Sequence, residues 1–356
     1  MNALCTLLAL NATPGIGTKR FRQLLERFGS LEAIGASSPS EWGEGSLAEE
    51  WKRTCQAGKG EREREESDRL GIQILPYTDP LYPPALRLLP DFPLVLYIQG
   101  VLPHQLSRAV AIVGTRAASS YGREMACLFA KEIAGYGRPI VSGLARGIDT
   151  AAHEGALETG ETVAVLGSGL SSMYPQENVG LARRITQKGA VISEYPLHTP
   201  PTRYTFPKRN RLISRLSTAI FLVEAPLKSG AMLTVECARQ HHLPIFVLPG
   251  RVDEESFQGN HHLIQGGAFL VSRARELLQT LGDTILQQGA GLPSRVPELS
   301  SKERELLHLF KGREENFEKL AFQFSENVAT LGALLTSLVL KGVLQESPGK
   351  IYKKVF

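Results

Sequence analysis

The chain has 356 residues, enough for two or three domains, and 42% of them are hydrophobic, which supplies a core of ordinary size. Its formal net charge is only +4, so only the distribution of charge is informative about nucleic acid. The apolar run Leu4–Leu10 is too short to span a bilayer and follows no basic residue, so we expect a cytoplasmic protein without a signal peptide or membrane anchor. The cysteines form no CxxC pair, which argues against a disulfide framework and a zinc site: Cys5, Cys55, Cys127 and Cys237.

Residues 1 to about 70 are predicted to form a helical unit of their own. Apolar residues recur at helical spacing from Leu4 to Leu8 and again from Phe21 to Phe28, which predicts two helices. The turn Pro14-Gly15-Ile16-Gly17 between them precedes Lys19 and Arg20 and resembles the hairpin of helix-hairpin-helix modules. Its main-chain amides are suited to holding a phosphate. A purely structural glycine turn is an equally good interpretation.

From residue 71 to 282 the pattern changes to short, β-branched apolar runs separated by amphipathic segments such as Glu124–Ala134 and Thr150–Glu158. Such runs are typical of buried parallel strands. Their alternation with helices predicts an α/β fold, an extended Rossmann-like, doubly wound and mostly parallel sheet. The predicted strands are Val110–Val113, Pro139–Ser142, Thr162–Leu166, Ala190–Ser193, Ala219–Val223 and Ile245–Leu248.

Residues 283 to 297 are rich in glycine, proline and glutamine, which predicts a linker. A small third unit is predicted over residues 298 to 356. Its first helix opens with a capping box from Ser300 to Glu303, two more apolar helix faces follow, and Gly342 is expected to end the last helix. Two short strands are predicted around Pro348-Gly349. Three helices and a hairpin in this order resemble a winged helix.

The most informative segment runs from Tyr195 to Val223, where the sequence has no acidic residue. Cations neutralise phosphates and flat rings stack on bases, so their mixture is typical of a site for single-stranded nucleic acid. A solvated basic loop is the alternative interpretation. The cations are Arg203, Lys208, Arg209, Arg211 and Arg215, and the interleaved aromatic residues are Tyr204 and Phe206.

Glycines follow several of the predicted strands. In an open parallel sheet the ligand lies beyond the carboxyl ends of the strands, and glycines there let main-chain amides approach a phosphate. For any one of these turns, backbone geometry alone is also a sufficient reason for glycine. The turns are Gly114-Thr115-Arg116, Ser142-Gly143 through Gly147, Gly167-Ser168-Gly169 and Pro249-Gly250.

Two nucleotide-binding alternatives are weaker. A dinucleotide site would continue Gly167-Ser168-Gly169 with a third glycine, but Ser172 stands there and only Glu194 is a distant candidate for the ribose carboxylate. The segment Ser229–Glu236 resembles the P-G-G-x-G-T-x-x-E loop of the lysine-decarboxylase-like nucleotide phosphoribohydrolases. It lacks the double glycine of that loop. A nucleotide phosphoribohydrolase remains the alternative function.

Other catalytic patterns are missing from the sequence. The pairs His241-His242 and His261-His262 have no carboxylate at ligand spacing, so we expect no metal site. Asp149 and His153 lie four residues apart, and a local hydrogen-bonded pair is the simpler interpretation. No serine lies in a G-x-S-x-G motif, so no activated nucleophile is indicated. We expect no catalytic residue and no cofactor.

The order of the motifs resembles that of the bacterial DNA-processing protein A family, also called DprA or Smf. The similarity is strong over about residues 75 to 280, and the flanking units fit the usual domain plan of the family. The motifs are Val113–Arg116, Ser142–Asp149, Gly167–Leu170, Tyr174-Pro175 with Asn178, Ser193-Glu194, Phe206–Ile213, Val223–Ala225, Ser229–Ala231 and Gly259-Asn260.

This resemblance implies a binding protein rather than an enzyme. It implies a homodimer that binds incoming single-stranded DNA in natural transformation, protects it and helps to load the RecA recombinase through the Rossmann-like domain. The DNA would lie in a positive pocket, where Phe206 meets a base and main-chain amides at Gly143 and Gly147 contact phosphates. The implied DNA-binding residues are Arg116, Ser142, Gly143, Arg146, Gly147, Phe206, Lys208, Arg209, Asn210 and Arg211.

The chain departs from the family pattern at a few positions. Arg215 stands where glycine is usual before Leu-Ser, Ser171 replaces a common acidic residue, and His198 replaces a frequent glycine. In the third unit, the expected recognition helix from Val328 to Lys341 has no cation before its last residue. Because reading of the major groove uses cations, we favour a protein-interaction or regulatory role for this unit.

Overall fold

The computed structural model describes residues 2–42, 45–283, 299–310, 314–324, 327–347 and 349–354. The chain divides into two compact units, Met1–Thr284 and Ile285–Phe356. The segment expected to be a linker lies outside the described residues except for Asp283. Asp283 forms an ion pair with the buried Arg138, whose Nη2 lies 3.2 Å from its Oδ1. This aspartate therefore belongs to the first unit.

The first unit contains a nine-stranded sheet in the order β1-β2-β6-β5-β4-β3-β7-β8-β9. The seven strands from β6 to β9 are parallel, and β2 runs antiparallel to both β1 and β6, so the predicted mostly parallel α/β sheet is confirmed. All six predicted strands are present, while β1, β2 and β9 were not predicted. The strands are β1 (Gln73–Pro76), β2 (Val95–Gly100), β3 (Val110–Val113), β4 (Ile140–Ser142), β5 (Thr162–Val165), β6 (Gly189–Ser193), β7 (Ala219–Leu222), β8 (Ile245–Val247) and β9 (Phe269–Leu270).

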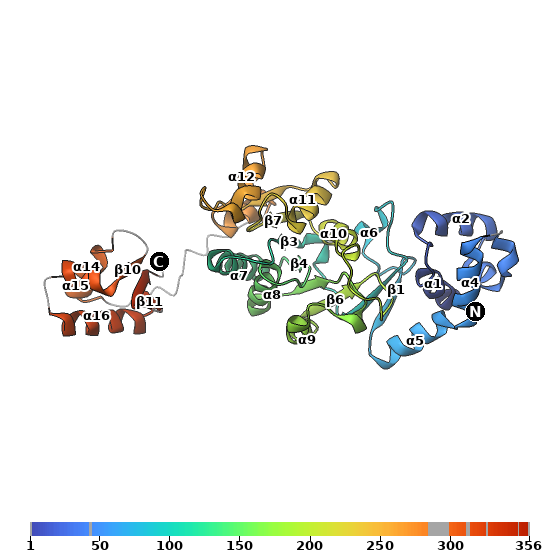
Figure 1. Ribbon diagram of the computed structural model, residues 1–356, viewed down its shortest axis with the longest axis horizontal. Coiled ribbons are helices and arrows are strands. Elements are labelled where there is room, and N and C mark those ends of the chain that lie inside the picture. The colour runs from blue at the N-terminus through green and yellow to red at the C-terminus, as the bar shows by residue number, and fades with distance from the viewer. Residues whose placement is uncertain are drawn as a thin grey trace. The chain divides into compact units, whose positions relative to one another are not determined.

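Helices cover both faces of this sheet, with α7, α8 and α9 on one side and α10, α11 and α12 on the other (Figure 1). From β3 the chain adds β4, β5 and β6 in one direction and then returns to place β7 beside β3. This reversal between β3 and β7 is where ligands of doubly wound sheets bind. The helices are α6 (Pro84–Arg87), α7 (Ser120–Gly135), α8 (Ile148–Thr159), α9 (Val179–Ile185), α10 (Thr205–Arg215), α11 (Gly230–Gln240), α12 (Gln258–Gln265) and α13 (Ala274–Thr280).

The N-terminal helices pack in the same unit as the sheet. Their core includes Trp42 stacked on Trp51 with ring centroids 4.6 Å apart. Glu63 of this module accepts a hydrogen bond of 2.6 Å from the amide of Leu197, and burial raises the pKa of Glu63. The module thus holds the loop between β6 and α10 in place. The helices are α1 (Ala3–Asn11), α2 (Thr18–Phe28), α3 (Leu31–Ala36), α4 (Ser46–Gln56) and α5 (Lys59–Arg69).

The second unit packs three helices against a small antiparallel sheet in the order β10-β12-β11. The predicted capping box is confirmed, because Ser300 and Glu303 bond each other's main-chain amides. Glu303 is buried, which raises its pKa, but hydrogen bonds from Lys341 and the two serines Ser300 and Ser337 outweigh burial and lower the pKa to about 2. The elements are α14 (Ser301–His308), β10 (Glu314–Asn316), α15 (Phe317–Gln323), α16 (Val328–Leu340), β11 (Leu344–Ser347) and β12 (Ile351–Lys354).

Candidate nucleic-acid interface

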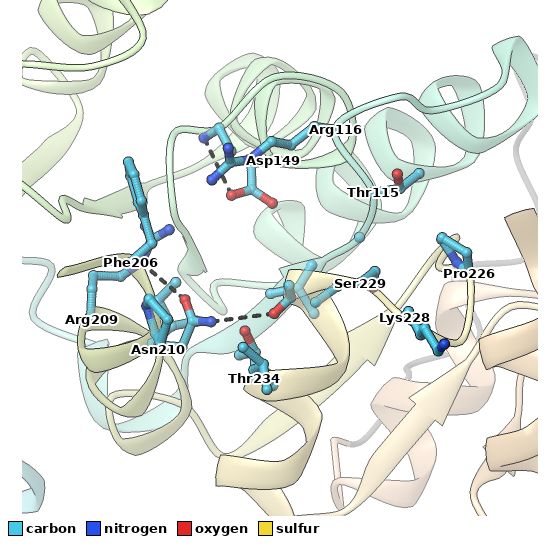
Figure 2. A pocket seen from close by; sticks show the side chains of 18 of the residues that line it. Thr115, Arg116, Asp149, Phe206, Arg209, Asn210, Pro226, Lys228, Ser229 and Thr234 are labelled. Atoms are coloured by element: carbon cyan, nitrogen blue, oxygen red, sulfur yellow. Dashed lines mark hydrogen bonds between the residues drawn. The ribbon is translucent and has the colours of Figure 1, made fainter. Parts of the chain in front are cut away.

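A pocket of about 480 Å³ opens at the carboxyl edge of the sheet, where β3 and β7 lie side by side (Figure 2). Its walls come from the turns after β3, β4 and β7 and from the first turns of α10 and α11. The sheet topology therefore gathers segments that are more than 100 residues apart in the sequence into one site. The lining includes Gly114, Thr115, Arg116, Ala145, Asp149, Arg203, Phe206, Arg209, Asn210, Lys228, Ser229 and Thr234.

A second pocket of about 220 Å³ adjoins the first and is lined by Gly143, Arg146 and Tyr174 among others. Arg116 and Phe206 line both pockets. The guanidinium carbon of Arg116 lies 5.0 Å from the centroid of the Phe206 ring, within the range of a cation–π contact. The ring of Tyr174 also contacts Phe206, and the centroids of these two rings are 6.0 Å apart. The two pockets thus share a wall made of a cation and an aromatic ring.

Arg116 is exposed, and it forms no ion pair with a carboxylate in the part of the chain that the structure describes. It follows β3 directly through Gly114 and Thr115, so the carboxyl end of a central strand fixes its main chain. An exposed guanidinium beside an aromatic ring can meet a phosphate with one group and a base with the other. This arrangement suits a flexible strand better than a rigid duplex.

Most of the basic segment, Thr205–Arg215, forms helix α10 rather than a loop, and the cations of the segment point in different directions. Arg211 contacts two carboxylates, Glu194 at 2.5 Å and Asp91 at 2.9 Å. The expectation that these cations have no carboxylate nearby is therefore wrong for Arg211, because the fold brings acidic residues from outside the segment. Arg215 donates from Nε to the carbonyl of Ala85 at 3.1 Å.

Arg209 lies inside the protein, with an exposed fraction of 4%. Its Nη1 donates to the carbonyls of Gly143 at 2.8 Å and Val165 at 2.5 Å. The negative charge of the Asp149 carboxylate also stabilises the charged form of Arg209. Burial lowers the pKa of Arg209 to about 10, so it stays charged at neutral pH. Burial raises the pKa of Asp149, and Arg209 opposes that rise. Arg209 therefore supports the floor of the site from within.

The loop after β4 is held by Asp149, whose Oδ2 accepts from the amides of Gly143 at 3.1 Å and Ala145 at 3.3 Å. The Gly143 amide, which was expected to contact a phosphate, is thus already bonded inside the protein. Gly147 has φ +73°, and a Cβ there would approach the carbonyl oxygens of Thr115 and Arg116 to 2.5 and 2.7 Å. Glycine is required at position 147 for both reasons.

The pockets bring together six of the ten predicted site residues, namely Arg116, Gly143, Arg146, Phe206, Arg209 and Asn210. The other four do not line either pocket. Ser142 is buried and donates to the carbonyl of Ile112 at 2.7 Å. Gly147 shapes the loop, Arg211 is paired with carboxylates, and Lys208 is exposed nearby on α10.

Sequence analysis did not assign Lys228, Ser229 or Tyr174 to the site, and it named Arg203 only as a cation of the basic segment, although all four line a pocket. Lys228 and Ser229 follow β7, and the rule that ligands meet the carboxyl ends of strands was the signal that would have found them. The hydroxyl of Ser229 is buried at the start of α11 and has no hydrogen-bond partner among the described residues. Glu236, the last residue of the hydrolase-like segment, is exposed and accepts from Gln240 at 3.4 Å, away from the pocket.

One histidine of each pair has a structural partner. The ring nitrogen Nδ1 of His241 lies 2.8 Å from the Ser214 hydroxyl, and Nε2 of His261 lies 3.1 Å from the Gly250 carbonyl. The expected pair of Asp149 and His153 is wrong, because Nδ1 of the buried His153 instead lies 2.7 Å from the Thr162 hydroxyl. Among the described residues no cluster of three or more metal-binding side chains occurs, and none of the described helices is long and apolar enough to cross a bilayer.

A carboxylate that lines neither pocket pairs with Arg146 of the second pocket. Glu177 accepts from Nη2 of Arg146 at 3.0 Å, and both side chains are about half exposed. This hydrogen bond lowers the pKa of Glu177, which keeps the carboxylate charged. A phosphate that approaches Arg146 must therefore compete with Glu177.

Replacing Glu177 by Gln is expected to strengthen the binding of an anionic strand about three- to tenfold at low salt, since it removes a competing charge, and the gain should shrink at high salt. Fluorescence anisotropy of a labelled oligo-dT measures this. Glu158→Gln is the matched control, because Glu158 pairs with Lys131 at 2.6 Å with similar exposure but lies away from both pockets. An equal gain in both variants would show a general charge effect instead.

Comparison with known proteins agrees with this geometry. The family model described as DNA recombination-mediator protein A matches residues 73–282. Protein Smf of Escherichia coli is 42% identical over 210 residues, which are 58% of this chain and 56% of that protein. Protein Smf of Synechocystis is 36% identical over 295 residues, 79% of this chain and 74% of that protein. The chain thus spans little more than half of the Escherichia coli relative.

Two solved structures are also similar. The X-ray structure of DNA processing protein A from Streptococcus pneumoniae superposes with a TM-score of 0.68 at 30% identity, over 78% of this chain and 98% of that one. A structure of DNA processing protein A from Helicobacter pylori, which concerns its binding of single-stranded DNA, gives a TM-score of 0.54 at 33% identity over 59% and 95%. With the motif order, the sheet and the family model in agreement, the chain belongs to the DNA recombination-mediator protein A family.

Proposed function

We propose that this protein binds single-stranded DNA through the two pockets and acts as a recombination mediator that loads the RecA recombinase. The observation that carries the proposal is the wall of Arg116 and Phe206 between the pockets, an exposed cation 5.0 Å from an aromatic ring. A strand crossing this wall can place a phosphate on Arg116 and a base on Phe206. Family membership and the single-stranded DNA binding of the Helicobacter pylori relative support the same conclusion.

The finer parts of the proposal follow from the family. We propose that the protein is a cytoplasmic homodimer that protects incoming DNA in natural transformation and contacts RecA through the Rossmann-like domain. The proposed domains are a helical SAM-like or helix-hairpin-helix-like module over residues 1–70, the DNA-binding domain over 71–282, a linker over 283–297 and a winged helix over 298–356. For the winged helix a protein-interaction or regulatory role is proposed.

The alternative of a nucleotide phosphoribohydrolase has less support. Such a reaction needs a carboxylate free to act on the substrate, and Asp149 is the one carboxylate among the lining residues of the larger pocket. Asp149 is buried, accepts two main-chain hydrogen bonds and faces Arg209. We therefore propose a binding role without catalytic residues, metal or cofactor.

The test is a fluorescence-anisotropy titration of labelled oligo-dT and of a duplex of the same length, at two salt concentrations. We expect tighter binding of the single strand, with the logarithm of the affinity falling by about 0.7 per phosphate contact for each log unit of salt. No binding of oligo-dT at low salt would refute the proposal. Release of free base from a nucleoside monophosphate, measured in parallel, would favour the hydrolase instead.

A further inference from the structure

An arginine and a tyrosine are stacked on each other at the rim of the larger pocket, just before α10. The guanidinium carbon of Arg203 lies 4.8 Å from the centroid of the Tyr204 ring, and its Nη2 donates to the Tyr204 hydroxyl at 2.6 Å. Arg203 lines the larger pocket, and Phe206, three residues further on, lines both pockets. The stacked pair is therefore continuous with the proposed DNA site.

The ring of Tyr204 has no role in the core. Tyr204 is 65% exposed, a high fraction for a residue with a large aromatic side chain. The guanidinium of Arg203 makes a cation–π contact with this ring. An aromatic ring in solvent next to a binding site is available to a ligand, and a flat ring beside a cation matches the flat, electron-rich face of a nucleobase.

The turn that carries the pair is braced by hydrogen bonds between two threonines. The Thr202 amide donates to Oγ1 of Thr205 at 3.0 Å, the Thr205 amide donates to Oγ1 of Thr202 at 3.2 Å, and the Tyr204 amide donates to the same hydroxyl at 3.3 Å. The hydroxyl of Tyr195 also donates to the Thr205 carbonyl at 3.4 Å. A turn that is already ordered loses little conformational entropy when a ligand binds.

The local charge favours a polyanion as the ligand. The first turn of α10 has no acidic residue, and the side chain of its N-cap residue, Tyr204, makes no capping hydrogen bond. The partial positive charge of this helix end therefore adds to the charges of Arg203 and Lys208. A nucleobase that stacks on the pair would carry its phosphate toward these positive groups.

We propose that Arg203 and Tyr204 form a stacking subsite for one unpaired nucleobase of the strand, adjacent to the pocket. This subsite rests on the proposed function and extends it, because it adds a nucleotide contact at the ring of Tyr204, which lines neither pocket. The subsite recognises the flat face of a base. It therefore accepts any base, provided that the base is unpaired.

The test compares the wild type with Tyr204→Ala, Tyr204→Phe and a control, Tyr136→Ala, in the full-length protein. Tyr136 is also partly exposed but follows the C-terminus of α7, away from the residues that line the pockets. Each variant is titrated with oligo-dT and with an oligomer of the same length and charge in which every base is replaced by an abasic unit. The second probe retains the phosphates and removes stacking.

Tyr204→Ala is expected to weaken oligo-dT binding about five- to tenfold, near the lower end for base–aromatic stacking, and to leave abasic binding unchanged. Tyr204→Phe and Tyr136→Ala should stay within about twofold of the wild type on both probes. An equal loss on both probes, or no loss on oligo-dT, would overturn the subsite while leaving the proposed function intact. If the wild type itself bound no oligo-dT, the proposed function would fail first.

Discussion

Replacing Arg116 and Lys208 together by alanine is expected to weaken single-stranded DNA binding about hundredfold at low salt. Arg116 lines both pockets and stacks on Phe206, and each hydrogen bond between a charged side chain and a phosphate contributes about 1.5–3 kcal/mol. Both side chains are exposed, so the free energy of unfolding should hardly change. The loss of two cations should also reduce the slope of log affinity against log salt by about 1.4.

The two single variants separate the contributions. Arg116→Ala should cause most of the loss, since it removes a phosphate contact and the partner of Phe206, whereas Lys208 lies outside the pocket walls and should act mainly through its field. The matched control is Arg183→Ala with Arg184→Ala, which removes two exposed cations of α9 that line neither pocket. Equal losses in the two double variants would mean that net charge rather than the pockets governs binding.

The central strands were predictable because each is buried on both faces. A parallel strand in the middle of a doubly wound sheet reads as an uninterrupted apolar run, as Val110–Val113 and Ala219–Leu222 do. The edge strand β9 has two residues, both about half exposed, and so carries no such signal. β2 was missed for another reason. It pairs antiparallel with β6, whereas the prediction searched for strands that alternate with helices in a parallel sheet.

The order of the strands could not be read from the sequence, although it decides where the site lies. The chain visits β4, β5 and β6 before it returns to put β7 beside β3, and the connection that crosses back is α10. Glycines after each strand indicated an edge of the sheet but not which turns meet. For that reason the turn of Gly114 to Arg116 was assigned to the site and the turn of Lys228 and Ser229 was not.

Which cations of α10 are buried and which are exposed was also not predicted from the sequence. The cations were treated as one charged segment, but a helix places residues four apart on the same face. Ile213 is buried and so is Arg209, four residues earlier, but Leu212 is also buried while Lys208, four residues before it, is exposed. Helical periodicity alone therefore does not distinguish the two cations; the contacts of Arg209 with the carbonyls of Gly143 and Val165, which belong to other elements, do.

Arg209→Met is expected to reduce the free energy of unfolding of the first unit by about 3–5 kcal/mol near pH 8, the range for leaving a buried charge without the opposite charge that compensates it. The variant leaves the carbonyls of Gly143 and Val165 without their donor and Asp149 without its cation. The protein has two tryptophans, Trp42 and Trp51, and both lie in the first unit, so urea unfolding followed by tryptophan fluorescence reports on this unit. DNA affinity should fall as well, because the loop after β4 loses its support.

The pH dependence of this loss identifies its cause. Burial already raises the pKa of Asp149, and without Arg209 that pKa should rise further. An acid whose pKa is raised by folding costs no stability below its unfolded pKa, and the protein loses stability as pH rises from that value through the folded pKa. The deficit of Arg209→Met should therefore be smaller at pH 5 than at pH 8.

Adding Asp149→Asn to Arg209→Met removes the unpaired charge and keeps an oxygen that can accept from the Gly143 amide. This double variant should recover part of the stability at pH 8 and lose the pH dependence, since no titrating carboxyl remains there. Arg183→Met, an exposed change of the same type, should stay within about 0.5 kcal/mol of the wild type. A deficit that is equal at both pH values would place the loss in the two carbonyl hydrogen bonds and not in the pairing of Arg209 with Asp149.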